Sequence, residues 1–448
     1  MVELKMASDT FQRAAEWLSG SLTDFRPRAR FWVTRGSLAV LDEGLIAGSN
    51  FLIGILLARW LVPDQYGAYA LSYSIYLALA AFYRALILEP IAVFGPTFQF
   101  ADRKKYLGSL LRIQGVAVLP VMGVLGLSSY LASNLWASQS VASALKGLTL
   151  AAPFLLIFSF TRFSFYLDCK PGGALSGAIF YCVLLTSGLV ILYRHGLLSP
   201  FTAFLLMTVG ALLSGAVQLA RLKPAVRGKF FDDTTAEVWR KHWSYGRWSL
   251  PASLLAWLPA NIFYFLAGSF WGVAQAGGIK ALTNFIAPVG HLTAAFSLLL
   301  TPYIAKLYGK EGALGANLPV QKINALYLIA GISYCVAITL FSSVIFHALY
   351  AGRYSEFIYL VPWAAVVAAL NMVGSGSRIG LRAIQCPSSL FVAYCAAGAT
   401  SVAAGIPLVW IYGVPGAIAG SILSSLVMLV SVVWLFRKKV SVSAAVAI

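Results

Sequence analysis

Residues 41–71 read LDEGLIAGSNFLIGILLARWLVPDQYGAYAL, an apolar segment with an acidic pair, a turn without Lys or Arg, and a second apolar segment. About 20 apolar residues cross the roughly 30 Å hydrocarbon core of a bilayer. Residues 37–61 supply them despite Asp42, Glu43 and Asn50. The stretch therefore predicts a hairpin of two transmembrane helices that carries charge inside the membrane.

The composition is that of a polytopic membrane protein. Of 448 residues, 60% are hydrophobic and 11% are charged, and the mean hydropathy is +0.81. The five cysteines form no CxxC pair, so neither a disulfide framework nor a metal site is expected. Residues 1–36 are polar and basic and contain no signal peptide, so we expect insertion through the first transmembrane helix.

Hydropathy windows of about 19 residues predict twelve transmembrane spans. They cover residues 37–61, 66–88, 106–132, 145–167, 173–193, 199–221, 248–271, 274–303, 323–349, 357–379, 388–411 and 415–436. With the amino terminus inside, 25 basic residues fall on the cytoplasmic side and 3 on the outer side. Because Lys and Arg accumulate on the cytoplasmic side, both termini are expected there.

The longest inner loop divides the spans into two halves of six. The expected parts are a cytoplasmic segment 1–36, an N-lobe 37–222, a cytoplasmic linker 223–247, a C-lobe 248–436 and a cytoplasmic tail 437–448. An offset of 211 residues aligns the halves and places Gly67 on Gly278. An even number of spans per half makes such repeats parallel. The expected fold is all-α, with two six-helix lobes around a central cavity.

Polar side chains share one face of each of the first two spans. Glu43, Asn50 and Gly54 form a stripe with other small residues on the first helix. On the second helix, Tyr69, Tyr73 and Tyr76 lie on one face, and we expect them to line the cavity. Tyr66, at the start of that face, is expected in the aromatic belt of the membrane interface.

The same offset predicts the opposite wall of the cavity. It aligns the tyrosine face with Lys280, Asn284 and His291 of the eighth span. These three residues also share a helical face. The two halves are therefore expected to line one cavity with different chemistry.

Residues 38–100 resemble the polysaccharide transporter family. The resemblance is carried by residues 41–71, by YRALILEP at 83–90 and by FGP at 94–96, and it recurs weakly in GGIKAL at 277–282. That family contains O-antigen and exopolysaccharide repeat-unit flippases. It belongs to a superfamily with the lipid II flippase and the multidrug and toxin extrusion antiporters.

The resemblance implies a V-shaped flippase of the bacterial inner membrane. Such a protein moves a polyprenyl-diphosphate-linked oligosaccharide to the outer leaflet by alternating access, for O-antigen, capsule or exopolysaccharide synthesis. The family commonly places basic residues in the cavity for the diphosphate, and its acidic residue early in the first span matches Asp42. The implied partners are the lipid-linked sugar, the bilayer, H⁺ or Na⁺ if either couples, and the polysaccharide polymerase machinery.

Basic residues inside the spans are candidates for the diphosphate. Arg59, Arg112 and Lys280 lie near span ends, where a long side chain also reaches the headgroups. An Arg fork binds diphosphate oxygens in a bidentate manner, whereas Lys provides a point charge. The predicted substrate-binding residues are Arg84, Arg162, Lys280, Arg378, Tyr69, Tyr73, Tyr76, Asn50, Asn261 and Asn284.

The acidic pair is consistent with two roles. Asp42 and Glu43 point about 100° apart; Glu43 lies on the stripe of small residues, whereas the family pattern favours Asp42. Either residue couples an ion, or the pair forms a structural salt bridge with Arg35 or Arg84. Glu89 and His291 complete the set of predicted coupling or gate residues.

No catalytic motif is visible. The sequence lacks GxxxxGK[ST], HExxH and GxSxG, so neither an enzyme nor a cofactor is expected, and nucleic acid is not an expected partner. Energy is then supplied by an ion gradient or by the substrate gradient. The alternatives are a cation-coupled multidrug antiporter and a polytopic O-antigen polymerase or ligase, although no predicted outer loop is long enough for external chemistry.

Overall fold

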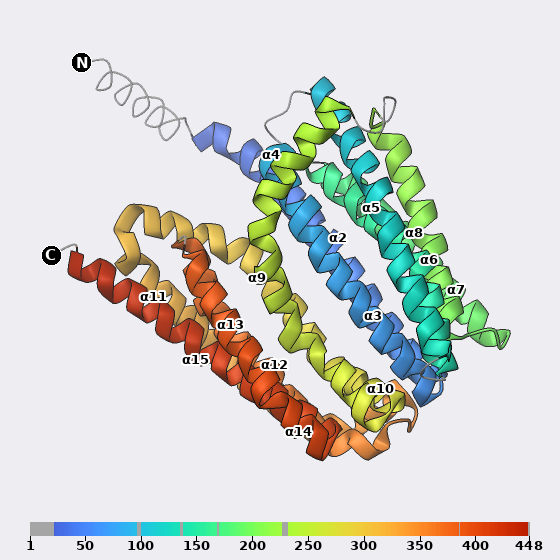
Figure 1. Ribbon diagram of the computed structural model, residues 1–448. Helices are drawn as coiled ribbons and strands as arrows, with labels where there is room; N and C mark the ends of the chain where they lie inside the picture. The colour runs from blue at the N-terminus through green and yellow to red at the C-terminus, as the bar shows by residue number, and fades with distance from the viewer. Residues whose placement is uncertain are drawn as a thin grey trace, which may run out of the picture.

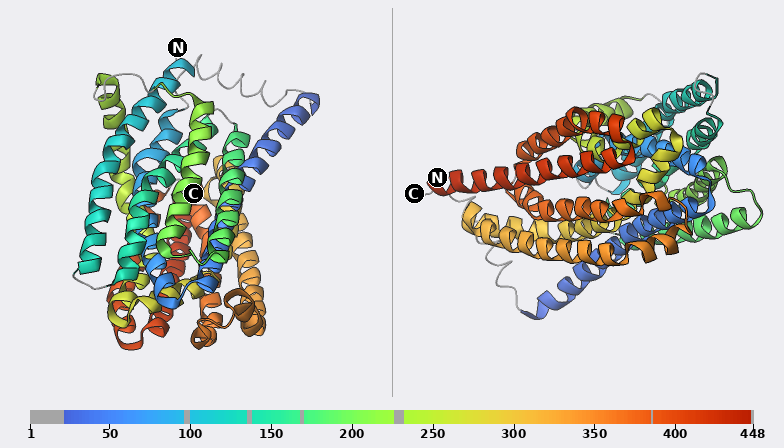
Figure 2. Two further views of the ribbon diagram at one scale, coloured as in Figure 1. Left: turned by 90° about the vertical axis from the view of Figure 1, so that its right-hand side faces the viewer. Right: turned by 90° about the horizontal axis from the view of Figure 1, so that it is seen from below.

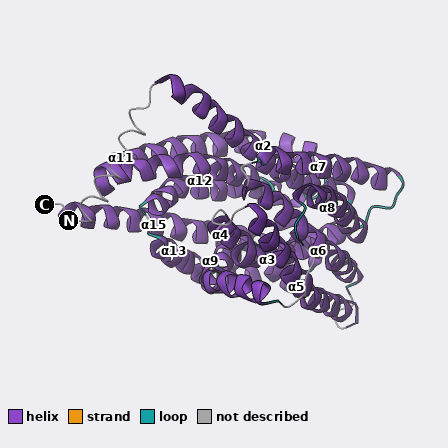
Figure 3. Cartoon of the chain, turned by 90° about the horizontal axis from the view of Figure 1, so that it is seen from above, coloured by secondary structure: helices purple, strands orange, loops and turns teal. Residues whose placement is uncertain are grey.

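The computed structural model describes residues 22–95, 100–134, 138–167, 170–225, 232–384 and 386–446. All regular structure in these residues is helical (Figures 1 and 3). Seen from above in Figure 3, the helices gather into two bundles with α9 and α4 between them. Two further views show the same helices running alongside one another (Figure 2).

The N-lobe begins with the long helix α2. Its helices are α2 (Leu22–Trp60), α3 (Pro63–Tyr83), the π-helical turn η1 (Arg84–Leu88), α4 (Glu89–Phe94), α5 (Phe100–Asn134), α6 (Gln139–Leu167), α7 (Pro171–Arg194) and α8 (Pro200–Leu222). Proline in the first turn starts several of them, because its missing N–H needs no partner there. At α8, Ser199 and Thr202 also form a capping box.

The C-lobe contains one long helix with a sharp turn inside it. Its elements are α9 (Asp233–Trp271), α10 (Val273–Thr283), α11 (Ala287–Tyr350), η3 (Ser355–Leu360), α12 (Val361–Ala383), α13 (Pro387–Ala403), α14 (Gly405–Tyr412) and α15 (Val414–Val446). Gly312 has φ 66° and ψ −160°, so α11 is two helices joined at a sharp turn.

Eleven of the described helical segments are long and apolar enough to cross a membrane. The further predicted span, 274–303, is built from two pieces, α10 and the first part of α11. The break leaves carbonyl groups that other side chains satisfy: the hydroxyl of Tyr350 donates to Ala281 O and that of Tyr334 donates to Phe285 O. An irregular backbone is tolerated at membrane depth only when it is buried in this way.

Helix replaces part of the segment predicted as a linker. Because α9 begins at Asp233, only residues 223–232 separate it from α8, and six of these lie outside the described residues. At the ends of the chain, α2 begins at Leu22 and α15 continues to Val446. Residues 1–21 of the predicted cytoplasmic segment lie outside the described residues.

The two ends of the bundle differ in charge. We call the end that carries Lys170, Lys223 and Lys438 the basic end, and the opposite end the far end. The far end contains turns at Gly196, Gly272, Gly352 and Gly413, all with positive φ. In Figure 1 the lobes meet at the far end, at the lower right, and diverge towards the basic end.

A close crossing of α3 and α10 joins the lobes at the far end. A Cβ on Gly67 would lie 1.8 Å from Val273 O, and one on Gly277 would lie 3.1 Å from Gly67 N. These two helices are equivalent in the predicted repeat. Only glycine allows this approach, so we call the contact the glycine seam.

Side chains reinforce the glycine seam. Arg353 donates to Leu61 O, and Arg59 Nη1 donates to Ala348 O at 3.2 Å. Both bonds join α2, or the turn after it, to the C-terminal end of α11 or the turn that follows. The far end is therefore closed by contacts between backbone and long side chains from both lobes.

We predict that Gly67→Ala disrupts the seam. The added methyl group has no room, and overpacking of this kind costs roughly 1–3 kcal/mol, so the thermal unfolding midpoint of the purified protein should fall. Gly44→Ala is the matched control, because nothing lies within 4 Å of a Cβ there. Equal midpoints for the two variants would contradict the seam.

Candidate functional site

Asp42 is the centre of a buried charge cluster in the N-lobe. Its side chain is fully buried, and Arg162 binds it in a bidentate manner, with Nε 3.2 Å from Oδ1 and Nη2 2.8 Å from Oδ2. The hydroxyl of Tyr166 donates to Oδ2 at 2.6 Å. Two charge-assisted donors on a single carboxylate fix α2 against α6.

Of the two salt-bridge partners predicted for the acidic pair, Arg84 is not its partner in the structure. Arg84 instead pairs with Glu89, at 3.8 Å, and the side chain of Arg35 lies outside the described residues. The sequence places Arg84 and Asp42 on adjacent spans, but it contains no information on which helices pack together. Arg162 is one of the predicted diphosphate ligands, and in this structure its charge is neutralised by Asp42.

Glu43 occupies a different environment from its neighbour. Its side chain is 70% exposed, and one oxygen lies 3.4 Å from Arg162 Nη2. It also lies within electrostatic reach of the exposed His291 on the opposite lobe. Glu43 therefore faces the space between the lobes, whereas Asp42 is sealed inside one of them.

The stripe on α2 faces the C-lobe, as its position beside Glu43 suggests. A Cβ on Gly54 would lie 3.3 Å from Asn284 Oδ1 of the opposite lobe. Asn50 lies between Glu43 and Gly54 on the same face and is half-buried. Small residues here allow the two lobes to approach each other.

The tyrosine face of α3 forms a continuous row of rings, stacked between Tyr69 and Tyr73 and tilted between Tyr73 and Tyr76, which we call the tyrosine stack. Successive centroids of Tyr69, Tyr73 and Tyr76 are each 5.6 Å apart. Tyr69 and Tyr73 are buried, and Tyr76 is partly buried. Lys280 Nζ of the C-lobe lies 5.4 Å from the centroid of the Tyr73 ring, a cation–π contact. The two predicted walls thus touch each other at this level.

Asn284 joins the walls nearer the far end. Its amide donates to Tyr66 Oη at 3.3 Å and to Tyr350 Oη at 3.2 Å. Tyr66 is fully buried, so its predicted position in the interfacial belt is wrong. Polar groups at the break after α10 require hydrogen-bond partners when they are buried. Tyr66 is buried because its hydroxyl accepts the bond from Asn284.

Two further predicted site residues connect the N-lobe to α9. Ser74 donates to Asn261 Oδ1 at 2.9 Å, and Ser249 donates to Glu89 Oε2. Asn261 is buried and Glu89 is partly exposed. These residues therefore hold the first C-lobe helix against α3 and α4.

Arg378 lies within the C-lobe, apart from the other predicted residues. It donates to Asn371 O at 2.5 Å and to Ser375 Oγ at 2.6 Å. Tyr327 and Tyr394 lie within electrostatic reach of it. No ion pair with Arg378 occurs in the part of the chain that the structure describes, so its charge is held by neutral groups alone.

Some contacts of this region involve residues that were not predicted. Tyr166 was missed, although it lies four residues after Arg162 on the same helical face. Arg112, for which the sequence favours neither the substrate nor the headgroups, pairs with Asp232 at 2.9 Å. The buried His242 bonds Tyr106 Oη at 2.7 Å and Leu86 O at 3.0 Å. The contacts of His242 link distant segments of the chain, and no local pattern in the sequence predicts them.

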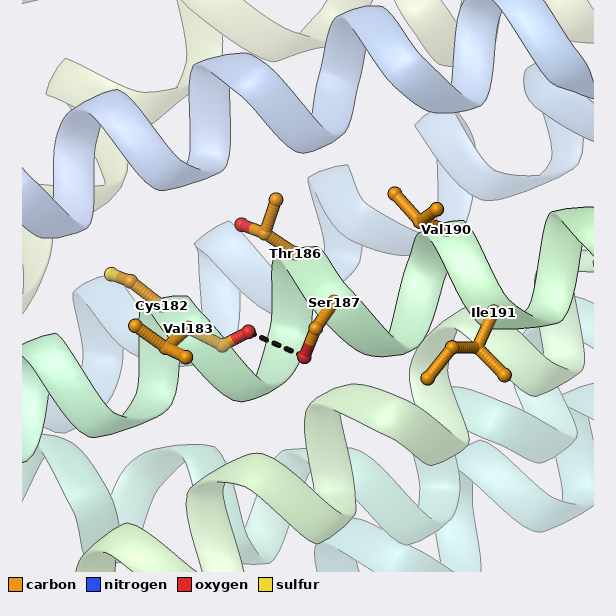
Figure 4. A pocket seen from close by; sticks show the side chains of 6 residues that line it. All are labelled: Cys182, Val183, Thr186, Ser187, Val190 and Ile191. Carbon is orange, nitrogen blue, oxygen red and sulfur yellow. Dashed lines mark hydrogen bonds between the residues drawn. The ribbon is translucent and has the colours of Figure 1, made fainter.

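A hollow of about 640 Å³ lies on the surface of α7 (Figure 4). Cys182, Val183, Thr186, Ser187, Val190 and Ile191 line it. In Figure 4 the Ser187 hydroxyl is bonded to the carbonyl of Val183. All six lining residues belong to α7 and none of them is charged, and Val183 and Ile191 are exposed. It therefore has the character of a surface that faces lipid.

Comparison with known proteins finds similarity in structure alone. No protein-family model matches the chain, and no curated protein sequence does. An inward-facing MATE-family multidrug resistance transporter of the MOP superfamily has a TM-score of 0.73 at 14% identity, over 91% of this chain and 99% of that chain. The lipid II flippase MurJ, in an inward closed conformation, has a TM-score of 0.68 at 13% identity, over 90% and 87%.

The chain has the fold of the MOP-superfamily transporters. An outward-facing MATE-family transporter has a lower TM-score of 0.62, at 12% identity over 93% of this chain and 96% of that chain. The predicted class, a polytopic all-α protein in two lobes, is confirmed; eleven of the twelve predicted spans are apolar helical segments of the described residues, and the other is the broken pair of α10 and the first part of α11. The protein is a multi-pass membrane protein.

We predict that Asp42 and Arg162 depend on each other for stability. Breaking a buried pair leaves an uncompensated charge, which costs roughly 3–5 kcal/mol. Asp42→Asn and Arg162→Gln should therefore each lower the thermal unfolding midpoint, and the double variant should recover part of the loss. Glu43→Gln is the control, because that side chain is mostly exposed. Strictly additive losses in the double variant would contradict the coupling.

Proposed function

We propose that the protein moves an oligosaccharide linked to a polyprenyl diphosphate from the inner to the outer leaflet of a bacterial inner membrane. Alternating access of the two lobes carries the substrate across. The proposal is supported by a fold shared with the lipid II flippase MurJ and with MATE transporters. That likeness does not distinguish the substrates, so the choice rests on the charges of this chain.

The observation that carries the proposal is the positive charge of the C-lobe. Residues 248–436 contain seven basic and two acidic residues. Lys280 is held by the face of an aromatic ring, and Arg378 by neutral oxygen atoms. A cation without a carboxylate partner retains its attraction for an external anion. A diphosphate provides that anion, and its oxygens match both an ammonium and a guanidinium group.

The tyrosine stack suits the sugar part of the substrate. In this structure Tyr69 and Tyr73 are buried. Opening the far end requires the glycine seam and the Tyr73–Lys280 contact to separate, which exposes the rings and the ammonium group together. Aromatic faces pack on the apolar faces of sugars, and their hydroxyls bond sugar oxygens. We infer that the substrate meets this surface in the outward-open state.

We propose that the basic end is cytoplasmic. The excess of Lys and Arg supports this orientation, with 1–36, 223–247 and 437–448 on the inner side. The structure is then open inwards, in line with the higher TM-score of the inward-facing relative. In a cysteine-free background, Pro63→Cys and Tyr412→Cys should react with an impermeant thiol reagent from outside, whereas Lys241→Cys should not. The opposite labelling pattern would refute the orientation.

We propose Glu43 as the residue that couples an ion to transport. It faces the space between the lobes near His291, whereas Asp42 is locked by Arg162 and Tyr166. An ion drives the cycle only if it binds one state better than the other. Closure of the basic end would change the surroundings of Glu43 but would leave the internal contacts of Asp42 intact.

Glu43→Gln should therefore abolish the dependence of transport on pH or sodium while folding is retained. The measurement is substrate flipping in proteoliposomes with and without an imposed ion gradient. Asp42→Asn is the comparison variant, and its main effect should be a lower thermal unfolding midpoint. If Glu43→Gln keeps the full ion dependence, coupling does not reside at this residue.

A cation-coupled multidrug antiporter is the second candidate, because MATE transporters share this fold. A cavity for organic cations is expected to carry net negative charge, whereas this C-lobe is basic. The polymerase or ligase alternative lacks support in a fold whose structural relatives are transporters. Binding assays with the lipid-linked oligosaccharide and with a panel of organic cations distinguish the two transport candidates.

Lys280→Gln and Arg378→Gln should each slow the flipping of a diphosphate-linked oligosaccharide in proteoliposomes. Loss of a charge-assisted bond costs roughly 1.5–3 kcal/mol, about 10- to 100-fold in rate. Lys146→Gln is the control, because that residue is exposed at the far end. The same two substitutions should slow the flipping of a monophosphate-linked substrate less than that of the diphosphate-linked one. If both variants transport the diphosphate substrate normally, the proposed anionic site is wrong.

A further inference from the structure

A second basic site lies inside the N-lobe at the basic end. It is a pocket of about 260 Å³, in which five basic side chains meet three apolar ones and a serine. Its lining is Arg103, Lys104, Leu107, Ser164, Phe165, Lys170, Arg221, Leu222 and Lys223. The start of α5, the end of α6, the residue before α7 and the end of α8 supply these residues.

This pocket is separate from the space between the lobes. On α6, Ser164 lies about 200° around the helix from Arg162, so the pocket and the Asp42 cluster occupy opposite faces. The pocket lies among α5, α6, α7 and α8, whose ends gather at the upper part of Figure 1. No residue of the C-lobe lines it. The proposed transport path therefore does not account for its charge.

Two of the five cations of the pocket, Lys170 and Arg221, carry charge that no described carboxylate neutralises. Arg221 Nη1 donates to Ser176 Oγ at 2.9 Å, and Arg103 Nη1 donates to Leu167 O at 3.4 Å. Lys170 and Arg221 are exposed and form no ion pair with any described residue. At the start of α5, Asp102 pairs with Lys105 outside the pocket, and Asp168 lies outside the described residues.

We propose that this pocket binds the headgroup of an anionic phospholipid from the leaflet at the basic end. Basic pockets between transmembrane helices at this depth suit phosphate headgroups. The lining provides guanidinium and ammonium donors for the phosphate, and Leu107, Phe165 and Leu222 provide an apolar side for the start of the acyl chains. A soluble anion would use the cations but gain nothing from the apolar residues.

The position of the pocket gives the lipid a structural role. Ala225 N donates to Lys104 O at 2.9 Å, so the chain leaving α8 is fixed to α5 beside the pocket. The same connection leads to Asp232, which pairs with Arg112 of α5. A bound headgroup therefore draws together the four helix ends from which the connection between the lobes departs. This role is independent of the substrate proposed above.

The test uses the full chain in nanodiscs of phosphatidylcholine, with or without phosphatidylglycerol as a minor component. Native mass spectrometry should show phosphatidylglycerol retained on the protein. Lys170→Gln combined with Arg221→Gln should weaken retention roughly 25-fold, since each basic residue near an anionic lipid contributes roughly a fivefold change in affinity. Phosphatidylglycerol should also raise the thermal unfolding midpoint of the unaltered protein but not that of this variant.

Arg437→Gln combined with Lys438→Gln is the matched control. It removes the same charge from the basic end, on α15 of the other lobe, and should retain the lipid fully. Equal losses in the control and the pocket variant would overturn the proposal, because they indicate diffuse attraction. Soluble glycerol phosphate is the second arm, in detergent without lipid. If it protects the protein as well as phosphatidylglycerol does, the pocket is a site for a soluble anion and the lipid assignment is wrong.

Discussion

The close approach of α3 and α10 at the glycine seam is the constraint on which the rest of the architecture depends. Backbone meets backbone there, and a Cβ on Gly67 would overlap Val273 O. The two lobes are consequently held together at one end while their other ends diverge. The contacts near it, from Arg353 to the Tyr73–Lys280 pair, depend on the distance that this seam sets between α3 and α10.

The basic residues inside the two lobes are held in different ways. In the N-lobe, Arg162 is neutralised by Asp42, and Arg112 by Asp232. In the C-lobe, Lys280 lies against the Tyr73 ring, and Arg378 donates hydrogen bonds to neutral oxygen atoms. The first arrangement stabilises a rigid lobe, because a paired buried charge gains from each of its donors. The second leaves Lys280 and Arg378 with attraction for an anion, and the proposed function rests on this difference.

Much of the fold is predictable from the sequence because lipid imposes simple rules. Helices must be long and apolar, and the alternation of Lys and Arg marks their ends. The shared face of Tyr69, Tyr73 and Tyr76 follows from helical spacing in the same way. Periodicity does not show which charged side chains of different helices pair with each other. Asp42 pairs with Arg162, 120 residues away, and not with Arg84 on the neighbouring span.

The break after α10 shows a second limit of sequence reasoning. Residues 274–303 are apolar enough to suggest one continuous span, but Asn284 lies where the helix stops and binds Tyr66 and Tyr350. Its polar amide makes the interruption stable, and only tertiary structure supplies the two hydroxyls. The stretch that the sequence presents as an ordinary helix is therefore the place where both lobes and the tyrosine stack meet.

In the proposed transport cycle, the lobes pivot between a state closed at the glycine seam and one closed at the basic end. Spin-label distances measured across both ends in the same preparation test this cycle. One label pair replaces the exposed Lys105 and Lys322 at the basic end, and the other replaces the exposed Arg194 and Tyr412 at the far end. On addition of a diphosphate-linked oligosaccharide, the first distance should shorten while the second lengthens. Two distances that change in the same direction, or that both stay fixed, would contradict the claim.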